Sequence, residues 1–276
     1  MTLKQFFANA PVTLILMVVI LGLFIVQISS GVNIDNPTSE DLYRWGANFF
    51  PSSFADEPWR LVTSAFLHIG LMHLMFNTFA LFYFGQVAER HFGSVQFLAL
   101  FLLSAIGGNL LNGWITWQAI EQDGLRQIGQ SAGASGGIMG LGMALLTIEA
   151  CRYVMQRRAI RRYAEQSAQS SSSAPMPPSL KANAAPLKGL ALIMGINLAY
   201  GFVVPGIDNA GHIGGALTGM VLALALVWGI LSQSKRPNNH AFLWQPWLAI
   251  IGLMLAFIAI WWTLATDWQT FMVAHS

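Results

Sequence analysis

Long apolar runs separated by short polar segments dominate the chain. Each run is close to the length of about 20 residues that a helix needs to cross about 30 Å of hydrocarbon. The runs are continuously apolar rather than alternating in ten-residue segments, which argues against a membrane β-barrel. The pattern therefore predicts an all-α polytopic membrane protein. Its expected spanning helices are seven: 11–28, 69–88, 94–114, 133–151, 189–205, 211–231 and 244–265.

The composition agrees with this class. Of the 276 residues, 55% are hydrophobic and 9% are charged, whereas soluble domains carry about 25% charged residues. Disorder is excluded because it requires low hydrophobicity and high net charge. The net charge of +2 provides no general basic field, so a nucleic-acid partner is not expected. The expected surroundings are a lipid bilayer.

The distribution of Lys and Arg predicts the orientation of the helices. Half of the 14 basic residues fall within 152–188. When this segment is placed in the cytoplasm and the seven helices cross the membrane in turn, only three of the basic residues, Arg44, Arg60 and Arg126, lie outside. The N-terminus is then cytoplasmic and the C-terminus is outside. The short loops and simple charge pattern favour a bacterial inner membrane, and a mitochondrial or secretory-pathway membrane remains open.

The same pattern predicts the domain organisation. A short cytoplasmic N-terminus (1–10) precedes a six-helix core (11–231), and a connecting loop and a seventh helix follow (232–276). Within the core, the outer loop 29–68 is rich in aromatic residues, and we expect short helices lying partly in the outer leaflet. A folded outer cap without membrane contact is the alternative. Segment 152–188 is predicted to be a cytoplasmic linker, and its part 164–186, which is rich in Ser, Ala and Pro, is predicted to be flexible.

Polar side chains within apolar spans are candidate functional groups, because they are costly in hydrocarbon. His73 and Asn77 share one face of the second span, and both can donate a hydrogen bond. Ser135 opens the fourth span among small residues that let another backbone approach its hydroxyl group. His212 opens the sixth span, where a neutral imidazole can act as a general base.

Each of these groups also has a purely structural interpretation. Interhelical hydrogen bonds account for the His and Asn side chains, and small residues spaced four apart account for close helix packing. A metal site is not expected, because His68 and His73 fall on different helix faces and no carboxylate accompanies them. However, the second, fourth and sixth spans all begin outside. The polar groups are therefore predicted at one depth, as a nucleophile–base pair with oxyanion donors.

Over about residues 58–220 the chain resembles the rhomboid family of intramembrane serine proteases. The matching residues keep the family's order and spacing. They are Trp59-Arg60, His68, His73, Asn77, Gly85-x-x-x-Glu89-x-x-x-Gly93, Gly133-Ala134-Ser135-Gly136 and Gly211-His212-Ile213-Gly214-Gly215.

The resemblance implies a rhomboid-like six-helix core, here followed by a seventh helix, and a role for each matching residue. Ser135 would be the nucleophile and His212 the general base and acid. His73, Asn77 and the Ser135 N–H would form the oxyanion hole. Gly133 and Gly136 would border a substrate side chain. The implied substrates are transmembrane proteins cleaved near the outer face, and neither a metal nor another cofactor is implied.

Other positions matching or departing from the family are interpreted as structural. Many members carry an aromatic residue where this chain has Met139. Asp208 is expected to cap a helix rather than to complete a triad. Arg60 is expected to anchor the outer loop at headgroup level, and Glu89 to bond backbone or loop groups.

Two other functions remain open on the sequence. A non-proteolytic rhomboid-like protein could bind or chaperone transmembrane clients in the same groove. A transporter is the third possibility, although the polar groups cluster near the outer face and no pair of broken helices suggests inverted repeats.

Overall fold

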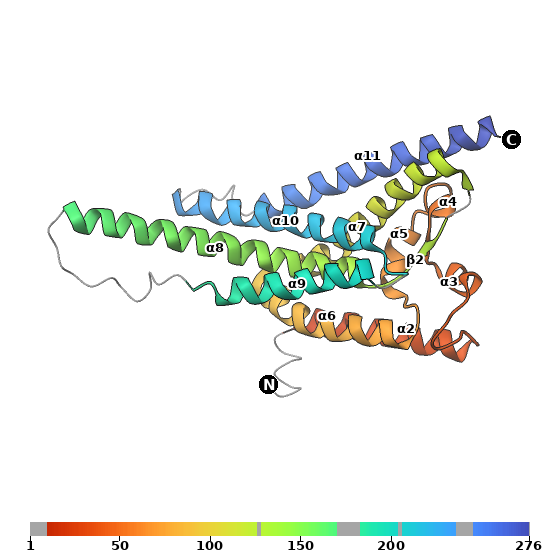
Figure 1. Ribbon diagram of the computed structural model, residues 1–276, viewed down its shortest axis with the longest axis horizontal. Coiled ribbons are helices and arrows are strands. Elements are labelled where there is room, and N and C mark those ends of the chain that lie inside the picture. The colour runs from red at the N-terminus through yellow and green to blue at the C-terminus, as the bar shows by residue number, and fades with distance from the viewer. Residues whose placement is uncertain (1–9, 126–127, 170–182, 204–205, 236–244, 276) are drawn as a thin grey trace.

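The computed structural model describes residues 10–125, 128–169, 183–203, 206–235 and 245–275 (Figure 1). Most of the predicted N-terminus (1–10) lies outside the described residues, as do 170–182 of the predicted linker and 236–244 of the predicted connecting loop. Within the described part, seven helices are long and apolar enough to cross a membrane, as the hydrophobic pattern predicts. They are α2 (Pro11–Ser29), α6 (Leu71–Phe92), α7 (Ser94–Asp123), α8 (Ser135–Gln169), α9 (Ala185–Val203), α10 (Asn209–Lys235) and α11 (Gln245–Ala274).

Helix α8, the longest of the seven spanning helices, is longer than the predicted fourth span. Helix α8 continues well past the expected end of the fourth span and extends beyond the other helices (Figure 1). The first half of the segment predicted as a linker, 152–169, is therefore helical. This stretch contains no Gly or Pro and is rich in Arg, Ala and Gln, which all have high helix propensity. The charges that mark the end of the apolar run do not end the helix.

The outer loop folds into short elements, as the aromatic-rich pattern predicts. The sequence Thr38-x-x-Asp41 forms a capping box that starts the first of them. A two-residue strand in this loop pairs antiparallel with a strand that follows α7, so that Asn48 lies opposite Ser131. Contact with the outer leaflet stays a prediction. The elements are α3 (Ser39–Trp45), β1 (Asn48–Phe49), α4 (Phe50–Ser53), α5 (Arg60–Thr63), η1 (Ser64–Phe66) and β2 (Gln130–Ser131).

Glycine faces bring α8 and α10 into backbone contact. A Cβ atom on Gly215 would collide with the Gly136 backbone, and one on Gly219 would collide with the Gly140 backbone. At the start of α10, a Cβ on Gly108 of α7 would lie 2.5 Å from the Gly211 carbonyl oxygen. Only glycine permits these approaches. Helices α7, α8 and α10 therefore form a tight central layer.

Glu89 joins α2 to this bundle from the end of α6. Its two carboxylate oxygens accept hydrogen bonds from the Val12 and Thr13 N–H groups and the Thr13 and Ser94 hydroxyl groups, at 2.7–2.9 Å. A carboxylate at the first turn of a helix satisfies N–H groups that have no intrahelical acceptor. Glu89 thus bonds backbone and side-chain groups, as the structural interpretation of the sequence predicts.

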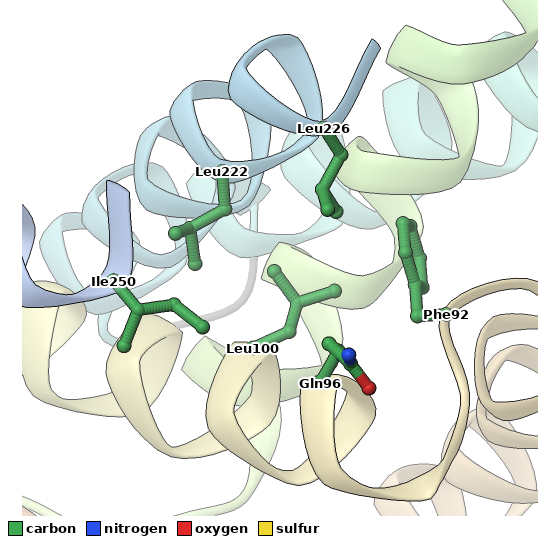
Figure 2. Close-up of a pocket in the computed structure, with 6 residues that line it drawn as sticks. All are labelled: Phe92, Gln96, Leu100, Leu222, Leu226 and Ile250. Atoms are coloured by element: carbon green, nitrogen blue, oxygen red, sulfur yellow. The ribbon is translucent and has the colours of Figure 1, made fainter. Parts of the chain in front are cut away.

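An apolar recess lies near the same end of the bundle (Figure 2). Gln96 supplies its only polar side chain among the six lining residues. Phe92, which lines the recess, ends α6, whereas His73 lies in the first turn of that helix. The recess is therefore separate from the predicted catalytic residues. It is lined by Phe92, Gln96, Leu100, Leu222, Leu226 and Ile250.

Candidate active site

Ser135 is the first residue of α8 and follows a loop held by backbone contacts. The Gly133 N–H donates to the Ser64 carbonyl oxygen at 2.9 Å, which fixes the loop two residues before the serine. The first helical hydrogen bond runs from the Ile138 N–H to the Ala134 carbonyl at 3.0 Å. The N–H groups of residues 135–137 precede this bond and have no acceptor within the helix. They are available as donors beside the serine hydroxyl.

Gly133 is the point where α6 meets the serine. A Cβ atom at Gly133 would lie 3.0 Å from His73 Nε2 and 3.6 Å from Ser135 Oγ. It would also lie 2.7 Å from His73 Cε1, and the Gly133 φ angle of +144° disfavours any other residue. The absence of a side chain at Gly133 thus lets the His73 ring pack directly against the loop backbone, close to the Ser135 hydroxyl.

Hydrogen bonds fix the donors on α6. The Ile69 N–H points to His73 Nδ1 at 3.4 Å, so Nδ1 is the acceptor and the neutral ring carries its proton on Nε2. This Nε2–H is the group that lies against Gly133. Asn77 Nδ2 donates to the His73 carbonyl at 3.0 Å, and its second hydrogen remains available. Asn77 is buried, so this amide is held away from water.

His212 lies in the first turn of α10, on a helix start that Asp208 caps. The Asp208 carboxylate accepts from the Gly211 N–H at 2.7 Å and from the Ser131 hydroxyl at 2.6 Å. The expected capping role of Asp208 is thereby confirmed. The Nδ1 atom of His212 is buried and has no hydrogen-bond partner in the described part of the chain.

The helix turn that carries His212 packs against the residue that follows Ser135. A Cβ atom at Gly136 would lie 3.3 Å from the carbonyl oxygen of Gly211, the neighbour of His212. Among the described residues no hydrogen bond joins Ser135 Oγ to His212, which is common for catalytic pairs before substrate binds. Backbone contacts join α8 to α10 beside Ser135, and the His73 side chain of α6 contacts Gly133; the catalytic pairing of Ser135 with His212 stays a prediction.

Gly136 and Met139 have clear structural surroundings. Gly136 packs against the backbones of α7 and α10, so any substrate contact that it makes uses its N–H group. Its predicted role beside the substrate stays a prediction. Met139, at the position of the family's aromatic residue, is 4% exposed and belongs to the main apolar core. It fills core space with a flexible thioether.

Arg60 does not reach the headgroup level as expected. Its side chain is 3% exposed, and Nη1 donates to the Tyr43 carbonyl at 2.7 Å and to the Ala47 carbonyl at 3.2 Å. Nε pairs with Glu57 at 2.6 Å. The guanidinium also lies over the rings of Tyr43 and Trp59. Its many donors are satisfied inside the outer loop, which makes Arg60 an internal clamp rather than an anchor at the membrane surface.

His68 lies before α6 rather than on it, so the comparison of helix faces does not apply to it. It is buried, and its ring centroid is 5.2 Å from that of His73. In the part of the chain that the structure describes, no group of three or more His, Cys, Asp or Glu side chains could hold a metal ion.

Sequence reasoning also missed Asn109. This residue lies in α7, is 7% exposed, and bonds three partners in the outer loop. A buried amide within an apolar span was the available signal.

Comparison with known proteins identifies the family. Residues 55–229 match the family model described as the Rhomboid domain. Rhomboid protease GluP of Bacillus subtilis is 33% identical over 207 residues, which cover 75% of this chain and 33% of that protein. RHOMBOID-like protein 6, mitochondrial, of Arabidopsis thaliana is 30% identical over 69% of this chain and 51% of its own length. Rhomboid protease AarA of Providencia stuartii is 30% identical over 78% of this chain and 72% of its own length. The chain thus spans between a third and about half of the first two relatives.

Proposed function

The chain belongs to the Rhomboid domain family, and from this premise we propose that it is an intramembrane serine endopeptidase. Its substrates are transmembrane segments of other membrane proteins, which it cleaves near the outer face of the membrane. The observation that supports the proposal is that His73 Nε2 and Ser135 Oγ both lie within 4 Å of the Cβ position at Gly133, while Gly136 packs against the Gly211 carbonyl next to His212. We propose that a nucleophile, a base and a preorganised donor meet there from α8, α10 and α6.

In the proposed reaction, Ser135 Oγ attacks the carbonyl carbon of the scissile peptide bond. His212 takes the hydroxyl proton and then gives it to the leaving amine, which breaks the C–N bond and leaves an acyl-enzyme. A water molecule, deprotonated by His212, hydrolyses this ester and restores the Ser135 hydroxyl. No carboxylate orients the histidine in this mechanism, because Asp208 is already engaged by Gly211 and Ser131.

The oxyanion of each tetrahedral intermediate is held by three kinds of donor. They are His73 Nε2–H, the second Asn77 amide hydrogen and the Ser135 backbone N–H. Each is oriented before substrate arrives, His73 by the Ile69 N–H and Asn77 by its bond to the His73 carbonyl. Donors fixed in advance need no reorganisation as charge develops, which is the main source of their catalytic effect.

The site also indicates a substrate preference. A closed transmembrane helix hides its carbonyl groups in i→i+4 bonds, so a good substrate unwinds readily near the scissile bond. Gly or Pro in that region lowers the cost of unwinding. Gly133 and Gly136 on either side of Ser135 support a preference for a small substrate side chain there, and the Gly136 N–H is a further backbone donor.

The proposed orientation is cytoplasmic for the N-terminus and outer for the C-terminus. The Lys and Arg distribution supports it. His73, Ser135 and His212 lie in the first turns of α6, α8 and α10. The short elements α3, α4, α5 and β2 and the C-terminal end of α11 gather at one end of the bundle (Figure 1). We further propose a bacterial inner membrane as the location.

The test is cleavage by the purified protein in proteoliposomes of a transmembrane substrate with a Gly-containing, helix-destabilised segment. Wild type should cleave it, and Ser135→Ala should not. Ser30→Ala, which changes an exposed serine of the outer loop, should retain wild-type activity and serves as the matched control. Cleavage that persists in Ser135→Ala would overturn the proposal. So would substrate binding without cleavage by wild type, which is the outcome that a non-proteolytic binder predicts.

A further inference from the structure

The seventh helix is attached to the outer loop rather than only to lipid-facing helices. Trp261 of α11 donates its indole N–H to the Ser53 carbonyl of α4 at 2.8 Å. About two turns further along α11, the ring of Trp268 packs edge-on against Phe50 of α4, with ring centroids 5.6 Å apart. Helix α11 therefore holds α4 through both a hydrogen bond and an aromatic contact.

A chain of buried side-chain hydrogen bonds leads inward from this contact. The Ser53 hydroxyl donates to Asn48 Oδ1 at 2.8 Å, and Asn48 Nδ2 donates to Asn109 Oδ1 at 3.3 Å. Asn109 Nδ2 in turn donates to the Ser64 hydroxyl and the Leu61 carbonyl, both at 2.8 Å. None of the linking side chains is more than 7% exposed. Because unpaired amides are costly in such surroundings, each side chain fixes the next one.

The chain of bonds ends at the loop that carries the proposed nucleophile. The Ser64 carbonyl accepts the Gly133 N–H at 2.9 Å, and Gly133 borders both His73 and Ser135. The backbone provides a second connection, because Asn48 pairs with Ser131 across β1 and β2. Both connections fix the segment before α8 to the outer loop, and α11 in turn contacts that loop.

We propose that α11 is a positioning element for the active-site loop, acting through Trp261, Asn48 and Asn109. This inference rests on the proposed protease function, since the geometry that it sets is that of Ser135 and Gly133. None of these three residues touches the reacting atoms. Their contribution is to hold the Ser64 carbonyl, and through it the Gly133 backbone, in the position at which Gly133 contacts His73 beside the Ser135 hydroxyl.

The main variant is Trp261→Phe, which removes the indole N–H and keeps an aromatic ring. The matched control is Trp262→Phe, because Trp262 is adjacent on the same helix and 67% exposed. Loss of one hydrogen bond corresponds to about a two- to tenfold change in rate. We expect Trp261→Phe to lower kcat by that factor with KM unchanged, whereas Trp262→Phe should match wild type in both.

A double-mutant cycle separates positioning from general weakening. Asn48→Asp is nearly isosteric and removes the donor to Asn109. If one chain of bonds carries the effect, the losses in kcat caused by Trp261→Phe and Asn48→Asp will be less than additive in free energy. Additive losses, or equal kcat values for Trp261→Phe and Trp262→Phe, would overturn the inference.

An independent readout does not require activity. In wild type and Trp262→Phe, the amide hydrogens of the loop before α8 should exchange slowly, and in Trp261→Phe they should exchange faster at Gly133. Unchanged exchange there contradicts the positioning role even when the variant loses stability. If wild type cleaves nothing but the exchange difference is present, the proposed function fails while the coupling of α11 to the loop stands.

Discussion

Replacing Gly215 with Ala tests whether the backbone contact between α8 and α10 sets the geometry of the active site. A Cβ atom at this position would lie 2.7 Å from the Gly136 carbonyl carbon and 3.0 Å from the Gly136 Cα atom. Non-bonded carbon atoms settle about 3.5–4.0 Å apart. The obstacle is backbone on both sides, so no change of rotamer relieves it. The helices must therefore move apart by roughly 0.5–1 Å.

The contact between Gly215 and Gly136 lies next to both proposed catalytic residues. Gly136 adjoins Ser135, and Gly215 lies one turn beyond His212, so the separation acts directly on the proposed catalytic pair. Overpacking of this kind costs about 1–3 kcal/mol of stability. A displacement of about 1 Å at reacting groups costs about 10²-fold in rate. We expect Gly215→Ala to lower both the melting temperature and the rate at which a fluorophosphonate labels the enzyme in detergent, the latter by about 10–100-fold.

Gly22→Ala in α2 is the matched control, because a Cβ atom there meets no other atom within 4 Å. It makes the same chemical change in a membrane-spanning helix without creating a steric clash. It should leave the rate of fluorophosphonate labelling unchanged while slightly favouring the helix. The reasoning is refuted if Gly215→Ala is labelled at the wild-type rate and melts at the wild-type temperature.

Three further predictions concern individual side chains. Asn77→Ala should reduce kcat by about 10²–10³-fold with little change in KM, because it removes one oxyanion donor; equal kcat values would show that Asn77 is not a donor. Glu89→Gln should cost about 1–3 kcal/mol of stability, because the new amide group faces two donors wherever it is placed; thermal unfolding measures this, and an unchanged melting temperature contradicts it. Burial, with a smaller contribution from His73, lowers the pKa of His68, which precedes the second spanning helix, to about 3. The His68 imidazole takes up a proton below about pH 6.5 in the unfolded chain but not in the folded chain. The free energy of unfolding should therefore fall as the pH is lowered from about 6.5 toward 3. In His68→Phe it should depend less steeply on pH.

The spanning helices could be predicted from the sequence because the bilayer imposes a strong and simple rule. Apolar runs of the required length have few alternatives to a helix when no water can satisfy the backbone. The ends of the helices could not be predicted equally well. Helix α8 continues through the arginines after Cys151, since charges end an apolar run but have no tendency to break a helix.

The candidate site was predictable in part. The sequence predicts polar groups at one depth in the first turns of three helices. The contact of His73 with Gly133 beside Ser135 depends on the path of the loop before α8, which no periodicity describes. The chain of bonds through Asn48 and Asn109 joins segments 61 residues apart, and the clamp at Arg60 joins it to a carbonyl 17 residues away. Such pairings depend on tertiary packing rather than on local sequence.

The most direct test of the central claim is to identify the residue that a fluorophosphonate modifies in the intact protein in membranes. Mass spectrometry of wild type should find the adduct on Ser135 Oγ. The adduct should be absent from Ser135→Ala and strongly reduced in His212→Ala, because the base that activates the hydroxyl is then missing. An adduct on another residue, or an adduct on Ser135 that forms equally fast in His212→Ala, would contradict the account.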